Sequence, residues 1–252
     1  GDKVFETFGT EFPLLLKYID ASDFLSIQVH PDDKTALENH DSFGKTEMWY
    51  IIQSEPEAEL ISGFKTKLDK KSYTKLLESG DLESALNYEK VSPGDVYFMP
   101  AGRVHAIGPG ILLAEIQQSS DITYRIYDYN RKDSNGNGRE LHNELALEAI
   151  DFTVHDSYKN IYPYVENKSV NVVNCRYFNT NVINFIKPVE KDFAFIDSFI
   201  IYMCTKGMGE IIYGNEEVIS FAKGETILIP AMIKNIIIKP TVASTLLEVF
   251  LL

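Results

Sequence analysis

Short apolar or alternating segments follow one another along most of the chain. Examples are "FLSIQVH", "EMWYII", "DVYFMP", "ILLAEIQ", "FIIYMC", "TILIP" and "STLLEVFLL". They are rich in Ile, Val, Tyr and Phe and are separated by Gly, Pro, Asn and Asp, which is typical of short strands in a sandwich or barrel. The pattern therefore predicts a mainly β protein.

Helical periodicity is confined to three segments. Residues 67–88 carry apolar positions at helical spacing broken by Gly80, which predicts two short helices, and residues 139–152 predict another. The segment "PDDKTALEN", which begins at Pro31, predicts a helical turn with two aspartates near the positive end of its dipole.

One stretch of the chain occurs twice. "PGDVYFMPAGRVHAI" begins at Pro93 and "KGETILIPAMIKNII" begins 130 residues later, at Lys223. Both contain a Gly, an acid, four strand residues and Pro-Ala, followed four residues later by a polar side chain, which is His105 in the first copy and Asn235 in the second. The repeat predicts two related β-domains, of which the second has lost its chemistry.

The first copy resembles the second conserved motif of cupins, which are small jelly-roll barrels with a metal site at the barrel mouth. We therefore expect two cupin-like jelly-roll β-barrels with a few short helices. Residues 1–155 would form a metal-binding catalytic cupin with helical insertions, and residues 156–252 a degenerate C-terminal cupin.

The strand period of two divides "FLSIQVH" into an apolar and a polar face. The two faces are Leu25, Ile27 and Val29, and Ser26, Gln28 and His30. With Glu47 in "GKTEMWYII" and His105 in the cupin-like motif, the polar face supplies two imidazoles, a carboxylate and a carboxamide. This set suits a divalent metal, zinc in particular, and such an ion is a Lewis acid.

Four segments in this order make the resemblance specific: "SIQVHPDD", "GKTEMWYII", "PAGRVHAIGPG" and "ILLAEIQQSSDITYRIYDYNR". Together they resemble type I phosphomannose isomerases of the short bacterial form. The resemblance implies a cytoplasmic enzyme that interconverts mannose 6-phosphate and fructose 6-phosphate, with one zinc ion per chain held by Gln28, His30, Glu47 and His105.

The same resemblance assigns further residues to the pocket. The family's active-site arginine falls on Arg125, which alternates with its neighbours on a strand and belongs to a local basic run that could bind a phosphate. The other catalytic candidates are Lys45, Glu115 and Asp121, and the expected substrate-binding residues are Ser26 and Arg131.

Two other functions fit parts of this pattern. His30, Glu47 and His105 also form a two-histidine, one-carboxylate set that suits an iron oxygenase of the cupin type. A non-catalytic phosphosugar-binding cupin with a structural metal is the second alternative.

The amino-acid composition limits the classes of molecule that the protein is expected to bind. The 37 acidic and 24 basic residues give a formal net charge of −13, which argues against a nucleic-acid or anionic-membrane surface. Cys175 and Cys204 are expected to be reduced thiols, and no apolar run suggests a membrane span. We expect a monomer or homodimer acting on a small phosphosugar. Relative to the family the chain begins some tens of residues late, so the first barrel is expected to have an open strand edge.

Overall fold

The computed structural model describes residues 1–251 and divides them into two compact units. Residues 14–159 form the first unit, here called the first barrel, and the described residues from 160 onward cluster with residues 1–13 in the second barrel. The first thirteen residues, which the sequence analysis placed with the catalytic domain, thus cluster with the second barrel. They contain helix α1 (Asp2–Phe8), and its first backbone N–H groups donate to Asp197 of that unit.

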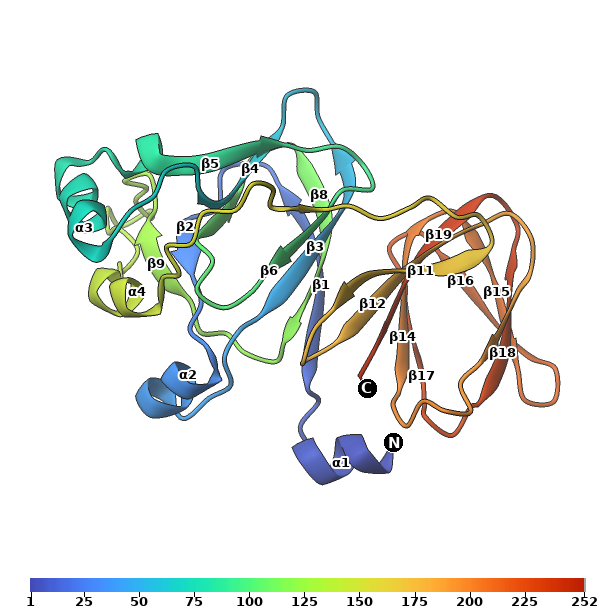
Figure 1. Ribbon diagram of the computed structural model, residues 1–252. Helices are drawn as coiled ribbons and strands as arrows, with labels where there is room; N and C mark the ends of the chain where they lie inside the picture. The colour runs from blue at the N-terminus through green and yellow to red at the C-terminus, as the bar shows by residue number, and fades with distance from the viewer. Residues whose placement is uncertain (252) are drawn as a thin grey trace. The chain divides into compact units, whose positions relative to one another are not determined.

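The first barrel consists of two antiparallel sheets with four short helical elements (Figure 1). One sheet has the order β1-β8-β3-β6-β10 and the other β5-β4-β7-β2-β9. The strands are β1 (Leu14–Ala21), β2 (Ile27–Val29), β3 (Glu47–Ser54), β4 (Glu59–Phe64), β5 (Leu86–Lys90), β6 (Val96–Met99), β7 (His105–Ile107), β8 (Ile111–Gln118), β9 (Tyr124–Tyr127) and β10 (Lys159–Asn160). The helical elements are α2 (Asp33–His40), α3 (Lys70–Ser79), the 3₁₀ turn η1 (Leu82–Ala85) and α4 (Asn143–Ala149).

The second barrel repeats this topology strand for strand. Its sheets have the orders β11-β12-β19-β14-β17 and β13-β18-β15-β16. The order β1-β8-β3-β6 corresponds to β12-β19-β14-β17, and the order β5-β4-β7-β2 corresponds to β16-β15-β18-β13. Strands β9, β10 and β11 lie outside this shared order, which agrees with the repeat in the sequence. The strands are β11 (Lys168–Asn174), β12 (Asn179–Phe185), β13 (Val189–Asp192), β14 (Ile200–Lys206), β15 (Met208–Tyr213), β16 (Glu217–Ala222), β17 (Thr226–Ile229), β18 (Asn235–Pro240) and β19 (Ser244–Phe250).

The helices lie close to where the sequence pattern places them. Gly80 ends α3 with a left-handed φ of 78°, a conformation that glycine adopts without steric cost. The second predicted helix is only the turn η1, and residues 86–90 form β5 instead. The helix predicted over residues 139–152 begins at Asn143, four residues later than expected.

The sheet that contains β2, β7 and β9 is covered on both faces. Its inner face packs against the facing sheet around Trp49, Tyr97 and Leu113. On its outer face Ile27 and Val29 pack into a core that includes residues of α3 and α4 (Figure 1). Leu25 was predicted to share that outer face, but β2 begins only at Ile27, and Leu25 packs against the inner core instead.

The repeated segment forms the same turn in both barrels, although its polar residue points differently. A backbone hydrogen bond closes the turn after Pro100 and again after Pro230. His105 is buried at the start of β7, whereas Asn235 is exposed at the start of β18 and Ile236 is buried beside it. The inward position after the turn is therefore taken by Ile236 in the second barrel, one residue later than His105 in the repeat.

The cysteines and the helices can be compared with what the composition predicts. Cys175 and Cys204 are both free thiols. Among the described residues no helix combines the length and the apolar character that a membrane-spanning helix needs.

A buried polar cluster lies inside the second barrel around Glu248. Its Oε2 accepts a hydrogen bond of 2.6 Å from the Tyr202 hydroxyl and lies 2.6 Å from Lys191 Nζ. Its Oε1 accepts from Asn181 Nδ2 at 2.8 Å and from Ser169 Oγ at 3.2 Å. Each oxygen of this buried carboxylate is therefore paired, which offsets the cost of removing the charge from water.

We expect Glu248→Ala to lower the free energy of unfolding by about 3 kcal/mol, because it leaves the buried Tyr202 hydroxyl without its acceptor and the partly buried Lys191 ammonium without its counter-charge. Urea unfolding followed by far-UV circular dichroism measures the change. The matched control is Glu217→Ala, an exposed glutamate on β16, which should change stability by no more than about 0.5 kcal/mol. Equal stability of E248A and E217A would contradict the expectation.

Candidate metal centre and active site

Strand pairing sets the side chains of the candidate site in one row. Gln28 on β2 pairs with His105 on one side and with Arg125 on the other. Side chains of directly paired residues point to the same face of a sheet. Because Ile27 and Val29 pack on the outer face, His105, Gln28 and Arg125 point to the inner one.

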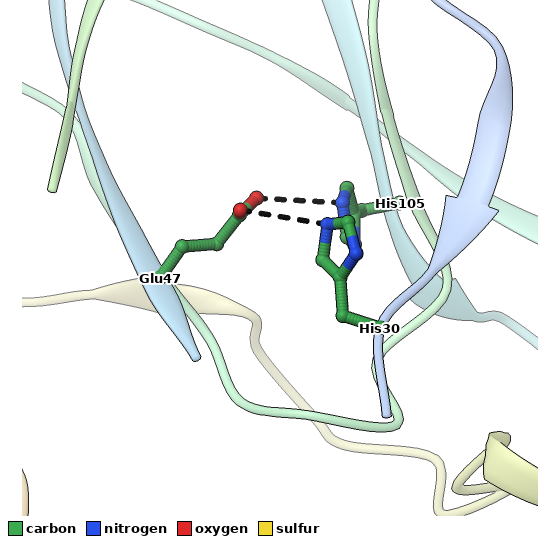
Figure 2. Close-up of side chains that lie close together, drawn as sticks. All are labelled: His30, Glu47 and His105. Carbon is green, nitrogen blue, oxygen red and sulfur yellow. Dashed lines mark ion pairs between the residues drawn. The ribbon is translucent and has the colours of Figure 1, made fainter. Parts of the chain in front are cut away.

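Glu47 approaches this row from the first residue of β3 in the facing sheet (Figure 2). Its Oε1 lies 3.3 Å from His105 Nε2, and its Oε2 lies 3.5 Å from His30 Nε2. The ligand atoms of the three residues all lie within 4.8 Å of one another, and all three side chains are buried. The structure thus brings together two histidines and one carboxylate that are separated in sequence by 17 to 75 residues.

The protonation of both imidazoles follows from their second contacts. His30 Nδ1 lies 2.8 Å from the Ile122 carbonyl oxygen, and His105 Nδ1 lies 2.8 Å from that of Arg103. A carbonyl oxygen only accepts hydrogen bonds, so each Nδ1 carries the proton and donates it. Both Nε2 atoms are then lone-pair acceptors that face the Glu47 carboxylate, which is the orientation seen for metal-binding histidines.

Burial strengthens this assignment. Burial lowers the pKa of His30 well below its ordinary value and lowers that of His105 to about 4, with the Lys45 ammonium contributing in the same direction. Burial also raises the pKa of Glu47, although the nearby Lys45 opposes the shift. The imidazoles are therefore neutral near pH 7, and the cluster consists of acceptors without a proton to share.

These residues fit a divalent metal ion. His30 Nε2 and both carboxylate oxygens of Glu47 are buried without a hydrogen-bond partner, and of these three atoms the Lys45 ammonium forms an ion pair with Glu47 Oε2 alone. The other acceptors are costly to bury unless a further cation satisfies them. Two ligand atoms on a tetrahedral zinc ion are about 3.3 Å apart at ordinary bond lengths. The observed separations of 3.3 and 3.5 Å match that spacing.

Gln28 lies against the same cluster. Its side-chain nitrogen is 3.3 Å from His105 Nε2, and its oxygen accepts a hydrogen bond of 3.4 Å from the Ser26 hydroxyl. The two amide atoms of glutamine are assigned from their hydrogen bonds. For the oxygen to serve as a metal ligand, the amide must be rotated by 180°, and the Ser26 hydroxyl could then accept from the amide nitrogen.

Lys45 and Glu115 extend the cluster within the barrel. Lys45 is buried with its Nζ 3.4 Å from Glu47 Oε2. Glu115 on β8 lies across from Trp49 on β3, and Trp49 Nε1 donates to its Oε2 at 2.9 Å. Burial raises the pKa of Glu115, and the Glu47 carboxylate adds to the shift.

Lys17 on β1 is a site neighbour that the sequence analysis missed. Its Nζ donates to Glu115 Oε1 at 3.0 Å and to Gln117 Oε1 at 2.6 Å. The signal was present in "FPLLLKYI", where a single charge interrupts an apolar strand. A charge at such a position usually has a partner inside the fold.

The contact between Glu115 and Trp49 has a counterpart in the second barrel. By strand register, Trp49 and Glu115 correspond to Tyr202 and Glu248, which also lie directly across from each other. In both barrels an aromatic donor on one strand binds a buried glutamate on the next. Among the described residues the histidine and carboxylate cluster occurs in the first barrel alone, so the glutamate–aromatic contact belongs to the shared framework.

The remaining predicted residues lie at the edge of the site. Arg125 Nη1 donates to the Glu140 carbonyl oxygen at 2.9 Å. Arg131 donates to the Phe24 carbonyl oxygen and forms an ion pair with Asp128, which ties two loops together. Asp121 is exposed and Arg125 is half-buried, so neither of these two predicted catalytic residues belongs to the buried cluster.

The chain is similar to known phosphomannose isomerases. Residues 1–68 match the family described as phosphomannose isomerase type I, catalytic domain. The mannose-6-phosphate isomerase ManA of Bacillus subtilis is 38% identical over 225 residues, which cover 88% of this chain and 70% of ManA. The mannose-6-phosphate isomerase of Streptococcus mutans is 45% identical over 149 residues, or 58% of this chain and 47% of that protein.

Solved structures agree. The mannose 6-phosphate isomerase from Bacillus subtilis has a TM-score of 0.87 at 36% identity, covering 98% of this chain and 79% of that one. A variant of the phosphomannose isomerase from Salmonella typhimurium has a TM-score of 0.77 at 16% identity, covering 99% of this chain and 81% of that one, and supports the fold alone. From the identity and coverage of the ManA match, this chain belongs to the type I phosphomannose isomerase family.

Proposed function

We propose that the protein interconverts mannose 6-phosphate and fructose 6-phosphate with one zinc ion held by Gln28, His30, Glu47 and His105. The observation that carries the metal assignment is the group of buried acceptors around Glu47, which have no proton to share. Membership of the family supports the sugar-phosphate substrate and the reaction. Two imidazoles and a carboxylate favour zinc over the oxygen-preferring Mg²⁺ and Ca²⁺.

A bound zinc ion would supply Lewis acidity toward a substrate oxygen, and the site would keep one net positive charge because Glu47 is its only anionic ligand. The backbone carbonyls of Ile122 and Arg103 orient the two imidazoles. With the Gln28 amide rotated so that its oxygen faces the metal, the Ser26 hydroxyl would accept from the amide nitrogen and fix that orientation. These contacts hold the ligand atoms in place before the substrate arrives.

The reaction itself is a proton transfer between adjacent carbons. The proton on C2 of the aldose is removed, the proton on O2 moves to O1 through an enediol, and a proton is returned to C1 to give the ketose. Such a step needs a base near the substrate and a positive group near the oxygen on which negative charge develops.

Lys45 and Glu115 are better placed than Asp121 to take part in this transfer. Both lie in the buried cluster, and the raised pKa of Glu115 makes its carboxylate a stronger base. Glu115 is nevertheless held by Lys17 and Trp49, a framework contact that the second barrel repeats. We therefore favour the Lys45 ammonium as the group that donates a proton and stabilises the developing negative charge, and Glu115 as the group that holds the interior charges in place.

Arg125 is proposed to stabilise the developing anion and to place the substrate, since it follows Gln28 in the row of inner side chains. Arg131 was expected to bind substrate, but its bonds to Phe24 and Asp128 favour a role in holding the surrounding loops. Binding of the substrate's phosphate group would then rest on Arg125 and other cationic side chains at the site.

A coupled assay for conversion of mannose 6-phosphate to fructose 6-phosphate tests the proposal. We expect turnover that is lost with a chelator and restored by zinc. Metal analysis that finds iron without zinc, in a protein that shows no isomerase turnover, would favour the oxygenase-type alternative. Tight binding of the phosphosugar without turnover by the zinc-loaded protein would instead identify a binding module.

The two substitutions His105→Ala and Arg125→Ala should separate metal binding from substrate placement. H105A removes a ligand and should lower zinc stoichiometry to near zero, whereas R125A should keep full zinc and lower kcat/KM by at least about a hundredfold. Zinc analysis by atomic absorption and steady-state kinetics measure the two effects. Full zinc in H105A would refute the ligand set, and unchanged kinetics in R125A would remove its role.

Lys45→Met should change the titration of the metal-free cluster. The Lys45 ammonium lowers the pKa of both His30 and Glu47, so its removal should raise both. An NMR titration of the His30 ring in metal-free protein should show protonation beginning at a higher pH than in the wild type. Lys34→Met, at an exposed position, is the control. An unchanged His30 titration in K45M would mean that the ammonium does not face the cluster.

A further inference from the structure

At the free edge of β9, the main-chain groups of Arg125 are hydrogen-bonded to a single residue, His142. β9 is the last strand of its sheet, so main-chain groups that point away from β2 have no strand to bind. The Arg125 carbonyl oxygen accepts a hydrogen bond of 2.7 Å from the backbone N–H of His142. The Arg125 backbone N–H donates to His142 Nδ1 at 3.2 Å. The imidazole thus takes the place of the carbonyl that a neighbouring strand would supply.

The same short segment also holds the Arg125 side chain. The carbonyl oxygen of Glu140, two residues before His142, accepts from Arg125 Nη1 at 2.9 Å. Three hydrogen bonds from residues 140–142 therefore fix both the backbone and the guanidinium of Arg125. This is the stretch that the sequence pattern had assigned to the start of a helix.

The position of His142 is informative in a second way. It is the N-cap of α4, where Ser, Thr, Asp or Asn would normally accept a hydrogen bond from the helix's own first turn. The His142 side chain makes no such bond within α4 and reaches across to Arg125 instead. The His142 side chain therefore stabilises the backbone of Arg125 and not the first turn of α4.

We propose that His142 is a positioning residue that sets the backbone and guanidinium of Arg125 beside the metal centre, acting only through that arginine. This inference rests on the proposed function for its kinetic consequence, although not for the hydrogen bonds themselves. It requires the neutral imidazole with its proton on Nε2, because Nδ1 must accept.

Hydrogen exchange of the Arg125 amide tests the contact without reference to activity. In metal-free and zinc-loaded protein, His142→Ala should speed exchange of that amide by about tenfold, since one hydrogen bond is lost. His142→Asn should keep most of the protection, because its Oδ1 can occupy the place of Nδ1. Leu141→Ala, an exposed neighbour in the same segment, should leave the amide unchanged. Unchanged exchange in H142A, or equally fast exchange in H142A and H142N, would overturn the proposal.

A double-mutant cycle tests the consequence for turnover. We expect H142A to lower kcat/KM by about tenfold in the wild-type background and to have no further effect in R125A, with zinc content unchanged throughout. An equal loss in both backgrounds would show that His142 acts by another route and would overturn the proposal. A wild-type protein that lacks isomerase activity would refute the proposed function instead, and the exchange experiment would still decide the contact.

Discussion

The buried carboxylate of Glu47 is the constraint around which the first barrel is arranged. It faces the Nε2 atoms of two imidazoles, each of which carries its proton on Nδ1 and donates it to a backbone carbonyl on the opposite side of the ring. Burial makes protonated imidazoles costly, so the two histidines cannot neutralise the carboxylate. The Lys45 ammonium lies 3.4 Å from one oxygen of Glu47, and a divalent cation would satisfy the acceptors that remain, which is why this cluster is a candidate metal centre.

Comparison of the two barrels separates framework from chemistry. Both keep a glutamate on the strand next to an aromatic donor, with a lysine nearby: Glu115 with Trp49 and Lys17, and Glu248 with Tyr202 and Lys191. The second barrel has Ile200 at the register position of Glu47 and Ile236 at the inward position that follows the repeated turn. The second barrel thus keeps the interior charge pairing and lacks the metal ligands.

Arg125 shows how a surface segment can support an interior site. Its strand lies at a sheet edge, where an exposed ladder would leave its main chain mobile. The segment before α4 supplies an N–H group, an imidazole nitrogen and a carbonyl oxygen to this one residue. The late start of α4 has a physical reason, because the Glu140 carbonyl oxygen and the His142 N–H are bound to Arg125, and helical bonding begins with the Ala146 N–H donating to the His142 carbonyl oxygen.

The sequence by itself determined the strand-rich architecture, the repeat and the polar set Gln28, His30, Glu47 and His105, because alternation, turn residues and ligand types are local properties. It placed Leu25 on the wrong face, since the strand alternation was extended to a residue that lies before the start of β2. It also missed Lys17 and gave His142 no partner. Only the tertiary structure decided these points, because strand register brings together residues that are far apart in the chain.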